Sequence, residues 1–550
     1  NALSKVPVPD AFVQSEDLIF AAAADENGFI SLRSLPASIT KLSITRIGFE
    51  PKTIDLAALV VVNNSAIIFL DNKVSSLAEV SVRAASGNGV FKPISDLDIH
   101  LRPINNSQEV LRMVPGLFIG QHAGGGKSEQ IFLRGFDIDH GTDINLTVDG
   151  MPVNMVSHAH GQGYADLHFL IPELIEKVNF NKGPYFADKG NFTTAGFVEF
   201  KTKDYLENSF VKAEGGQFNT FRGVAGINLL KPKGDRRSQS LYFGGEASFT
   251  KGFFESPQDF NRFNGLLKYH SSISNNSTLT ATVTGFKSRW NASGQIPNRA
   301  VDNGSIGFYG AIDNTEGGNT SRYNASVALL TNAANGGVFR NQVFYSKYAF
   351  ELYSNFTFFK EDPVNGDQIK QKEDRNIFGY NGSYQKEGVL GNIKTETKTG
   401  VQIRYDDVND IELSRTKNRS TVTNGIMLGD VNELNVGAYL SQRFSLSKSL
   451  DVTGALRADY FTNKYNDILA AAILKSNSTI ISPKLNLNYR VNNNVQLYLY
   501  NGRGFHSNDT RVAVQQGGKK VLPPAYGTDL GGIFKVGKKL VLQSALWYLW

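Results

Sequence analysis

The chain has 550 residues, a formal net charge of +6 and no cysteine; 20% of its residues are charged and 41% are hydrophobic. This length exceeds that of a single domain with one hydrophobic core, so we expect several domains. The lack of cysteine excludes a disulfide framework and thiolate chemistry. The small net charge, without a basic cluster that contains aromatic residues, argues against nucleic acid as a partner. No run of about 18 apolar residues occurs, so we expect no transmembrane helix, which leaves a closed β-barrel as a way to cross a membrane.

Residues 1–74 alternate short β patterns with turns. Asn27-Gly28 is a hairpin signal, because glycine accepts the positive φ of a tight turn. Leu42 and Ile44 alternate with polar residues, which is typical of a half-buried strand. We therefore expect a small β-sandwich, used for interaction or spacing, without a catalytic arrangement.

Residues 75–89 have the small, polar, glycine-containing composition of a linker. Within them, residues 77–84 alternate in the manner of an extended strand. Such a segment can add to the edge of a partner's sheet through main-chain hydrogen bonds. The residues expected to take part are Leu77, Glu79, Val80 and Val82. An ordinary tether would have the same composition, and this alternative stays open.

Residues 90–204 contain short apolar runs separated by turn signals, which predict a compact domain of short strands with long loops. Residues 109–116 (EVLRMVPG) read as a short helix that ends at Pro115-Gly116. The turn signals are Arg134-Gly135, Asp149-Gly150 and Lys182-Gly183-Pro184.

The order of these steps in residues 129–203 resembles the plug domain of TonB-dependent outer-membrane receptors, a family of transporters. DENGFISL and IGFEP in residues 1–74 are similar to the carboxypeptidase-regulatory-like domain that precedes the plug in many Bacteroidetes-type members. The resemblance implies that residues 77–84 act as a TonB box, which the TonB-ExbB-ExbD complex captures in the periplasm. Asn179 stands where the family usually has an acidic residue, so one charge pair between plug and barrel is in doubt.

Histidines gather in the loops of the plug. His158 and His160 lie two residues apart, and an extended chain would place both imidazoles on one side. Such a pair can bind a transition metal or donate hydrogen bonds to a carboxylate-rich iron chelate. The resemblance implies that the loops at 120–128 and 154–168 face the external mouth, and it makes five residues candidate ligand contacts: His122, Lys127, His158, His160 and Tyr164. Alternatively, these side chains only stabilise the loops.

The pair His158 and His160 is the nearest approach to an enzyme signature. Metallohydrolases need further ligands at set spacings and a supporting carboxylate. The residues after His160 match no such spacing. We therefore expect no enzyme and no resident cofactor, with a metal or iron chelate entering only as the transported ligand.

Residues 205–550 show alternating strands. Leu279, Ala281 and Val283 alternate with threonines, and residues 484–490 and 495–500 alternate in the same way. Rows of Thr, Asn, Lys and Arg on one face fit a wet lumen, and aliphatic rows on the other face fit lipid. Tight turns at 447–449 and 492–494 contrast with long loops expected at 288–320, 361–375, 406–430 and 503–524. We count roughly 15–16 strands of a transmembrane antiparallel barrel.

The resemblance implies a barrel of 22 strands around an internal α+β plug, so we expect the chain to be truncated at both ends. It also implies active import of a ligand, an iron-siderophore or another metal complex, across the outer membrane of a Gram-negative bacterium. The plug and the N-terminal domain would then face the periplasm, and lipids would surround the barrel. Two alternatives stay open: a carbohydrate or peptide importer that works with a surface lipoprotein, and a structural or adhesion barrel without transport.

Overall fold

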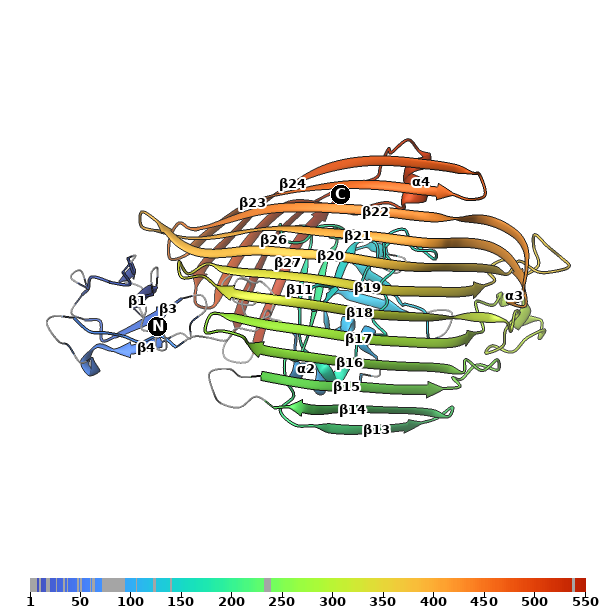
Figure 1. Cartoon of the computed structure of the whole chain (residues 1–550), viewed down its shortest axis with the longest axis horizontal. Helices are drawn as coiled ribbons and strands as arrows, with labels where there is room; N and C mark the ends of the chain where they lie inside the picture. The colour runs from blue at the N-terminus through green and yellow to red at the C-terminus, as the bar shows by residue number, and fades with distance from the viewer. Residues whose placement is uncertain are drawn as a thin grey trace.

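The computed structural model describes residues 94–550 except 105, 122–124, 139–140, 232–238 and 537–539, and, before them, residues 7–8, 11–15, 20–25, 27–32, 35–36, 38–46, 49, 52–59, 61 and 65–71. A small N-terminal sheet lies beside one end of a large curved sheet, and a mixed domain fills the curve of the large sheet (Figure 1). We call the large sheet the wall and residues 94–204 the plug.

The N-terminal sheet has four strands in the order β2-β1-β3-β4, and it packs on its own apolar cluster. Its elements are β1 (Phe12–Ser15), β2 (Ala21–Ala23), β3 (Lys41–Thr45), β4 (Lys52–Asp55) and the 3-10 helix η1 (Leu56–Ala58). Leu42 and Ile44 of β3 are buried, as their alternation predicts. Gly28 has φ +69°, so Asn27-Gly28 is the expected tight turn, although no strand flanks it among the described residues. Those residues form one sheet, so the second layer of a sandwich stays a prediction.

The plug contains a five-stranded sheet in the order β10-β9-β12-β11-β5 and a three-stranded sheet in the order β6-β7-β8. The strands are β5 (Ile94–Ser95), β6 (Leu117–Gly120), β7 (Gln130–Leu133), β8 (Phe136–Ile138), β9 (Ile144–Val148), β10 (Met151–Pro152), β11 (Ile175–Lys182) and β12 (Gly196–Thr202). The helices are α2 (Asp96–His100), η2 (Ser107–Met113) and η3 (Pro172–Leu174). The helix expected at 109–116 is therefore a 3-10 helix that begins two residues earlier.

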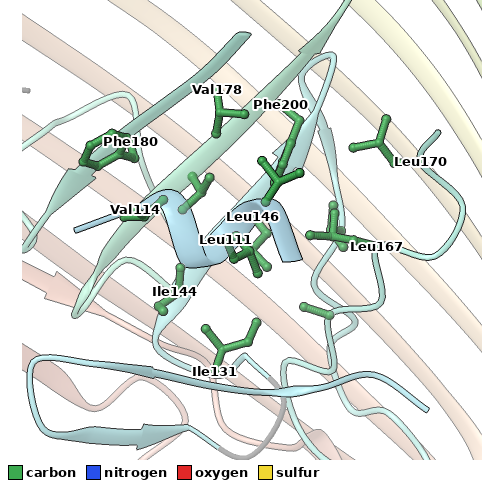
Figure 2. Close-up of a cluster of buried hydrophobic side chains, with 14 of the residues drawn as sticks. Leu111, Val114, Ile131, Ile144, Leu146, Leu167, Leu170, Val178, Phe180 and Phe200 are labelled. Atoms are coloured by element: carbon green, nitrogen blue, oxygen red, sulfur yellow. The ribbon is translucent and has the colours of Figure 1, made fainter. Parts of the chain in front are cut away.

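A single apolar cluster holds the two plug sheets and η2 together (Figure 2). Ile144, Leu146 and Val148 of β9 alternate with polar residues and are at most 4% exposed. Val178 and Phe180 of β11 face the same cluster from a neighbouring part of the sheet. The plug thus has a core of its own, and its shape does not depend only on the wall.

Two of the turn signals give the predicted geometry. Asp149 and Gly150 have φ +48° and +80°, and they join the antiparallel strands β9 and β10 as a primed turn does. Arg134 and Gly135, with φ +56° and +77°, join β7 to β8 in the same way. Because φ is positive at both glycines, an added side chain would be strained there.

The wall is one antiparallel sheet of 15 strands in which every strand pairs with the next one along the chain. This number agrees with the predicted 15–16. The strands are β13 (Phe210–Gly216), β14 (Thr220–Leu230), β15 (Gln239–Thr250), β16 (Phe260–Ser272), β17 (Ser277–Ala292), β18 (Glu316–Asn332), β19 (Val338–Ser354), β20 (Ile369–Leu390), β21 (Ile393–Lys417), β22 (Thr421–Ser445), β23 (Leu450–Asp467), β24 (Ala472–Asn492), β25 (Val495–Phe505), β26 (Pro524–Val536) and β27 (Leu540–Leu549). The loops carry α3 (Asn298–Asp302) and α4 (Thr510–Gln515).

The polar rows of the wall face the plug, as predicted. Thr280, Thr282 and Thr284 of β17 are at most 8% exposed, whereas Val283 is 56% exposed. Asn486 of β24 is buried and its neighbour Leu485 is 48% exposed. The outer face of the sheet is therefore apolar and its inner face is polar, which suits lipid outside and water or plug inside.

The connections differ between the two ends of the wall. Those at 273–276, 333–337, 391–392, 446–449 and 493–494 are short, and this end lies beside the N-terminal sheet (Figure 1). The opposite end, which we call the long-loop end, carries the loops 293–315, 355–368 and 506–523.

The long loop expected at 406–430 is wrong. The strands β21 and β22 run through this region and turn at 418–420, where Asn418 and Arg419 have φ +53° and +57°. At about 3.3 Å per residue, strands of this length extend far beyond a hydrocarbon core of about 30 Å. Beyond the bilayer, the outer face of the hairpin meets water and not lipid, so polar residues such as Asp407 and Glu412 replace the apolar outward row of a membrane strand.

The plug lies within the curve of the wall and not beside it. Side chains of the wall hydrogen-bond to the plug from strands β14, β16, β18 to β24 and β26; they are Arg222, Lys268, Arg322, Gln342, Glu373, Lys398, Glu433, Arg457, Lys484 and Asp529. The plug therefore fills the curve of the wall along most of its strands.

Among the described helices, none combines the length and apolarity that a bilayer crossing requires.

Candidate functional site at the long-loop end of the plug

Residues 154–168 of the plug, which we call the apical loop, form a turn against the wall. A bridge between Met155 and Tyr164 closes the loop, and Ser157 has φ +48°. The chain turns at Ser157 and bends again at residues 159 and 160, so the expectation that residues 158–160 are extended is wrong. Both imidazoles nevertheless reach the same part of the wall, on β19 and β20.

His158 is fully buried, and each of its ring nitrogens has a partner. Its ring stacks on that of Tyr164 at 4.3 Å between centroids. Nδ1 accepts the backbone N–H of His160 at 3.1 Å, so the proton of the neutral ring is on Nε2, which lies 3.0 Å from the hydroxyl of Tyr348. Glu373 Oε2 lies 4.0 Å from the same nitrogen. These contacts position the ring firmly against the wall.

His160 is half-buried beside it. Its Nδ1 lies 2.8 Å from Oε1 of Gln371, and since a carbonyl oxygen only accepts, Nδ1 carries the proton. The backbone N–H of Ala159 donates to Glu373 at 2.7 Å. Two neighbouring inward positions of β20 thus hold the tip of the apical loop.

The helix α4, in the loop after β25, covers the apical loop. Arg511 donates to the carbonyl oxygen of His158 at 2.9 Å, and the N–H of Thr510 donates to Ser157 Oγ at 2.9 Å. The hydroxyl of Thr510 also donates to Glu433 of β22 at 2.9 Å. A ligand that approaches from the long-loop end therefore meets α4 before it meets His158.

The other candidate ligand contacts lie deep as well. Lys127 is 1% exposed, and Tyr164 is fully buried with its hydroxyl accepting the N–H of Ser128 at 2.8 Å. His122 lies outside the described residues. Ligand contact by these five residues stays a prediction.

The metal site at His158 and His160 also stays a prediction. Among the residues that the structure describes, no group of three or more His, Asp or Glu side chains is placed to hold a metal ion. Two imidazoles fall short of the usual set of three or four protein ligands. A metal that arrives within a chelate would bring its other ligands with it.

Two of the predicted structural residues of the plug, Arg134 and Pro184, contact strands β26 and β24 of the wall. Arg134 donates to Asp529 of β26 at 2.7 Å, with both side chains nearly buried, and the Tyr185 hydroxyl donates to the same carboxylate. The carbonyl oxygen of Pro184 accepts from Lys484 at 2.6 Å. The segment proposed for TonB coupling, with Leu77, Glu79, Val80 and Val82, lies outside the described residues.

Glu173 of η3 provides a pH-dependent contact. Arg222 of β14 donates to both of its carboxylate oxygens at 2.7 Å. Burial alone would raise the pKa of Glu173, but the hydrogen bonds and charge of Arg222 outweigh burial and lower the pKa to about 2.

We therefore expect the Glu173–Arg222 pair to stabilise the plug fully above the ordinary pKa of 4.5, and to lose this contribution as the pH falls from 4.5 to about 2. The midpoint of urea unfolding of the purified protein, measured across this range, checks the expectation. The variant Glu173→Gln should remove part of the pH dependence. An unchanged pH profile in that variant would contradict the assignment.

The contacts that sequence reasoning missed join segments far apart in the chain. Neither the cover by α4 nor the partners of His158 and Arg134 on the wall lie near their plug residues in sequence. No local periodicity or turn signal carries such information. Only the alternation of polar and apolar residues along the predicted strands indicates which polar residues face inward.

A curved sheet with an apolar outer face, a polar inner face and a folded domain inside its curve is typical of a plugged β-barrel of the outer-membrane type. The model of the TonB-dependent receptor plug domain matches residues 86–197, and that of the TonB-dependent receptor-like β-barrel matches residues 251–532. The chain therefore belongs to the family of TonB-dependent outer-membrane receptors.

Several known proteins are similar to this chain. The vitamin B12 transporter BtuB of Vibrio vulnificus is 26% identical over 242 residues, which are 38% of this chain and 39% of that protein. The structure of the ferric citrate transporter FecA without ligand has a TM-score of 0.71 and 15% identity, and covers 83% of this chain and 69% of its own. The ferric yersiniabactin receptor FyuA of Yersinia pestis has a TM-score of 0.64 and 14% identity, over 84% and 72%. These relatives are transporters and receptors and not enzymes, and members of the family work with the TonB system and bind ligands.

Proposed function

We propose that this protein imports a metal chelate, an iron chelate in the first place, across the outer membrane. The observation that carries the proposal is that the wall hydrogen-bonds to the plug from β14 to β26, so passage requires the plug to move. Work for this movement would come from the TonB-ExbB-ExbD complex through residues 77–84, from the periplasmic side. Similar structures support the ligand class, since they are those of a ferric citrate transporter, a ferric yersiniabactin uptake receptor and a copper transporter.

Deletion of residues 77–84 is expected to abolish uptake and to leave ligand binding intact, because coupling and binding would lie at opposite ends of the barrel. Uptake of a radioactive ferric chelate by whole cells and its binding to the purified protein measure the two properties separately. Replacement of the segment by a Gly-Ser linker of equal length is the matched control for spacing. Uptake that persists after deletion would refute the coupling role.

Growth on single iron, copper or zinc sources tests the ligand class. The variants His158→Ala and His160→Ala are expected to impair growth on one of these sources, because both residues belong to the part of the apical loop that α4 covers and the wall holds. Gln371→Ala, which removes the partner of His160 and keeps both imidazoles, separates loop positioning from contact with the ligand. Unchanged growth of both histidine variants on every source would leave the metal chelate without support.

A second candidate function rests on an aromatic cluster at the long-loop end. Phe253, Phe308 and Tyr309 are 54%, 71% and 48% exposed, and the ring of Tyr309 contacts both phenylalanines. Such a surface suits import of a carbohydrate or peptide together with a surface lipoprotein. Purification from native membranes should then yield a lipoprotein that the variant Phe308→Ser/Tyr309→Ser loses.

A structural barrel without transport makes a different prediction: removal of the plug would change the uptake of no solute.

A further inference from the structure

A cavity of about 410 Å³ lies between the plug and the wall, and Asn154 at the start of the apical loop is among its lining residues. The plug side is formed by β9, β11 and residues 185–192, and the wall side by strands β19 to β25. Glu396, Arg443 and Thr453 line it, close to the short connections 391–392 and 446–449, so it belongs to the short-connection half of the wall. Its volume is within the range of about 300–1,000 Å³ that is typical of small-molecule sites.

Most cations that line this cavity already have a carboxylate partner. Lys398 lies 2.8 Å from Asp188, and Lys189 pairs with Asp188 and Glu199. The remaining pairs are Arg404 with Asp406, Arg443 with Glu396 and Arg457 with Asp459. These pairs neutralise the lining locally.

Arg340 of β19 is different. It lines the cavity, and its Nε and Nη2 atoms are buried without a hydrogen-bond partner. The negative charges of Asp188 and Glu199 attract the guanidinium of Arg340, but both carboxylates are already paired with lysines. Arg340 itself is half-buried, but buried guanidinium nitrogens without a hydrogen-bond partner are costly, so a site that keeps them is ready for an anion.

The surroundings of Arg340 have room for an anion with an apolar body. Ser383 stands directly opposite Arg340 on β20 and also lines the cavity. Asn179 of the plug faces the same space with an uncharged amide, so it brings no counter-charge. Phe186 and Phe344 provide apolar lining. A guanidinium presents two parallel N–H groups, a geometry that matches a carboxylate.

We propose that this cavity is an inner binding site for a carboxylate-bearing solute and that Arg340 binds the carboxylate. The occupant would be the imported solute on its way past the plug, and in this respect the site rests on the proposed function. The site lies in the short-connection half of the wall, whereas α4 lies at the long-loop end, so it would hold the solute after the plug has begun to move.

Because the chain has no cysteine, a single introduced thiol can report on the charge of the cavity. In the variant Ser383→Cys, we expect a negatively charged methanethiosulfonate reagent to react at least 10-fold faster than a positively charged reagent of the same size. Adding Arg340→Gln should bring the two rates together. Ser420→Cys, at the exposed turn between β21 and β22, is the control and should show the same rate ratio with and without Arg340. Equal rates in the Ser383→Cys variant with Arg340 present would overturn the proposal.

Protection by solutes defines the ligand class. Citrate, as a probe, should slow the reaction of the Ser383→Cys variant, and erythritol, which has no carboxylate, should not. Calorimetry of the purified receptor in detergent micelles should show citrate affinity at least 10-fold weaker in Arg340→Gln, partly restored in Arg340→Lys, and unchanged in Arg490→Gln, which removes an exposed arginine near the same end. Protection by phosphate without protection by citrate would overturn the carboxylate assignment.

These measurements use purified protein without the TonB complex, so they do not depend on uptake. Loss of uptake in the deletion of residues 77–84, together with citrate binding that is insensitive to Arg340, would reject the inner site and keep the proposed function. Citrate binding that depends on Arg340, in a protein that transports no solute, would keep the inner site and reject the proposed function.

Discussion

Replacement of Arg134 by alanine should lower the free energy of plug unfolding by about 3–5 kcal/mol, the usual cost of removing one partner from a buried ion pair. Arg134 donates to Asp529 at 2.7 Å, and the two side chains are only 6% and 5% exposed. Without the guanidinium, Asp529 keeps a buried charge with only the hydroxyl of Tyr185 as donor among the described contacts. The effect is large because the remaining carboxylate is uncompensated.

Tryptophan fluorescence provides the measurement for Arg134→Ala. The guanidinium of Arg134 lies 5.2 Å from the ring centroid of Trp547, and the chain has 3 tryptophans in total. In a Trp290→Phe/Trp550→Phe background, urea titration should report the release of the plug from β27. The double variant Arg134→Met/Asp529→Leu removes both charges and should cost much less than Arg134→Ala. Equal losses in the single and double variants would contradict a dominant role for the uncompensated charge.

The second large effect is expected for Lys268→Met. Lys268 of β16 is fully buried and donates to the carbonyl oxygen and hydroxyl of Thr202 at 3.0 and 2.9 Å. It also lies 3.0 Å from Asp204 and 3.5 Å from Asp149. Burial would raise the pKa of Asp204, but Lys201 and Lys268 together lower it, so this carboxylate stays charged. Removal of Lys268 should cost about 3–5 kcal/mol.

Urea unfolding of the plug measures this loss, and Lys347→Met is the matched control. Lys347 of β19 also pairs with a carboxylate, Asp374, but both side chains are more than a third exposed (38% and 40%). An exposed pair of this kind contributes about 0.2–1 kcal/mol. Similar losses in the two variants would show that burial does not set the strength of the contact between β16 and the plug.

Local chemistry accounts for the parts of the fold that could be predicted. The turn at Asp149-Gly150 follows from two adjacent residues that accept positive φ, and the inward rows of β17 follow from a strict alternation of Thr with aliphatic residues. The number of strands follows from the same alternation. The hairpin of β21 and β22 escapes this reasoning because its outward positions beyond the membrane are polar, which removes the alternation expected of a lipid-facing strand.

The candidate site was less predictable, because its geometry depends on contacts between distant segments. The sequence places His158 and His160 together, but it does not reveal that Ser157 turns the chain or that Arg511 covers His158. The partner of Arg134 lies 395 residues further along the chain. Arg340 stands out only once the partners of its neighbours in space are known.

The order of the domains along the chain has a consequence for biogenesis. Each strand of the wall pairs with the next, so the wall can grow hairpin by hairpin through contacts that are local in sequence. The plug precedes the wall, yet its partners extend from β14 to β26. It is therefore synthesised before all of its partners, and its contacts with Asp529 can form only after nearly the whole wall has been made, so the exposed surface of the plug has to stay free of aggregation until then.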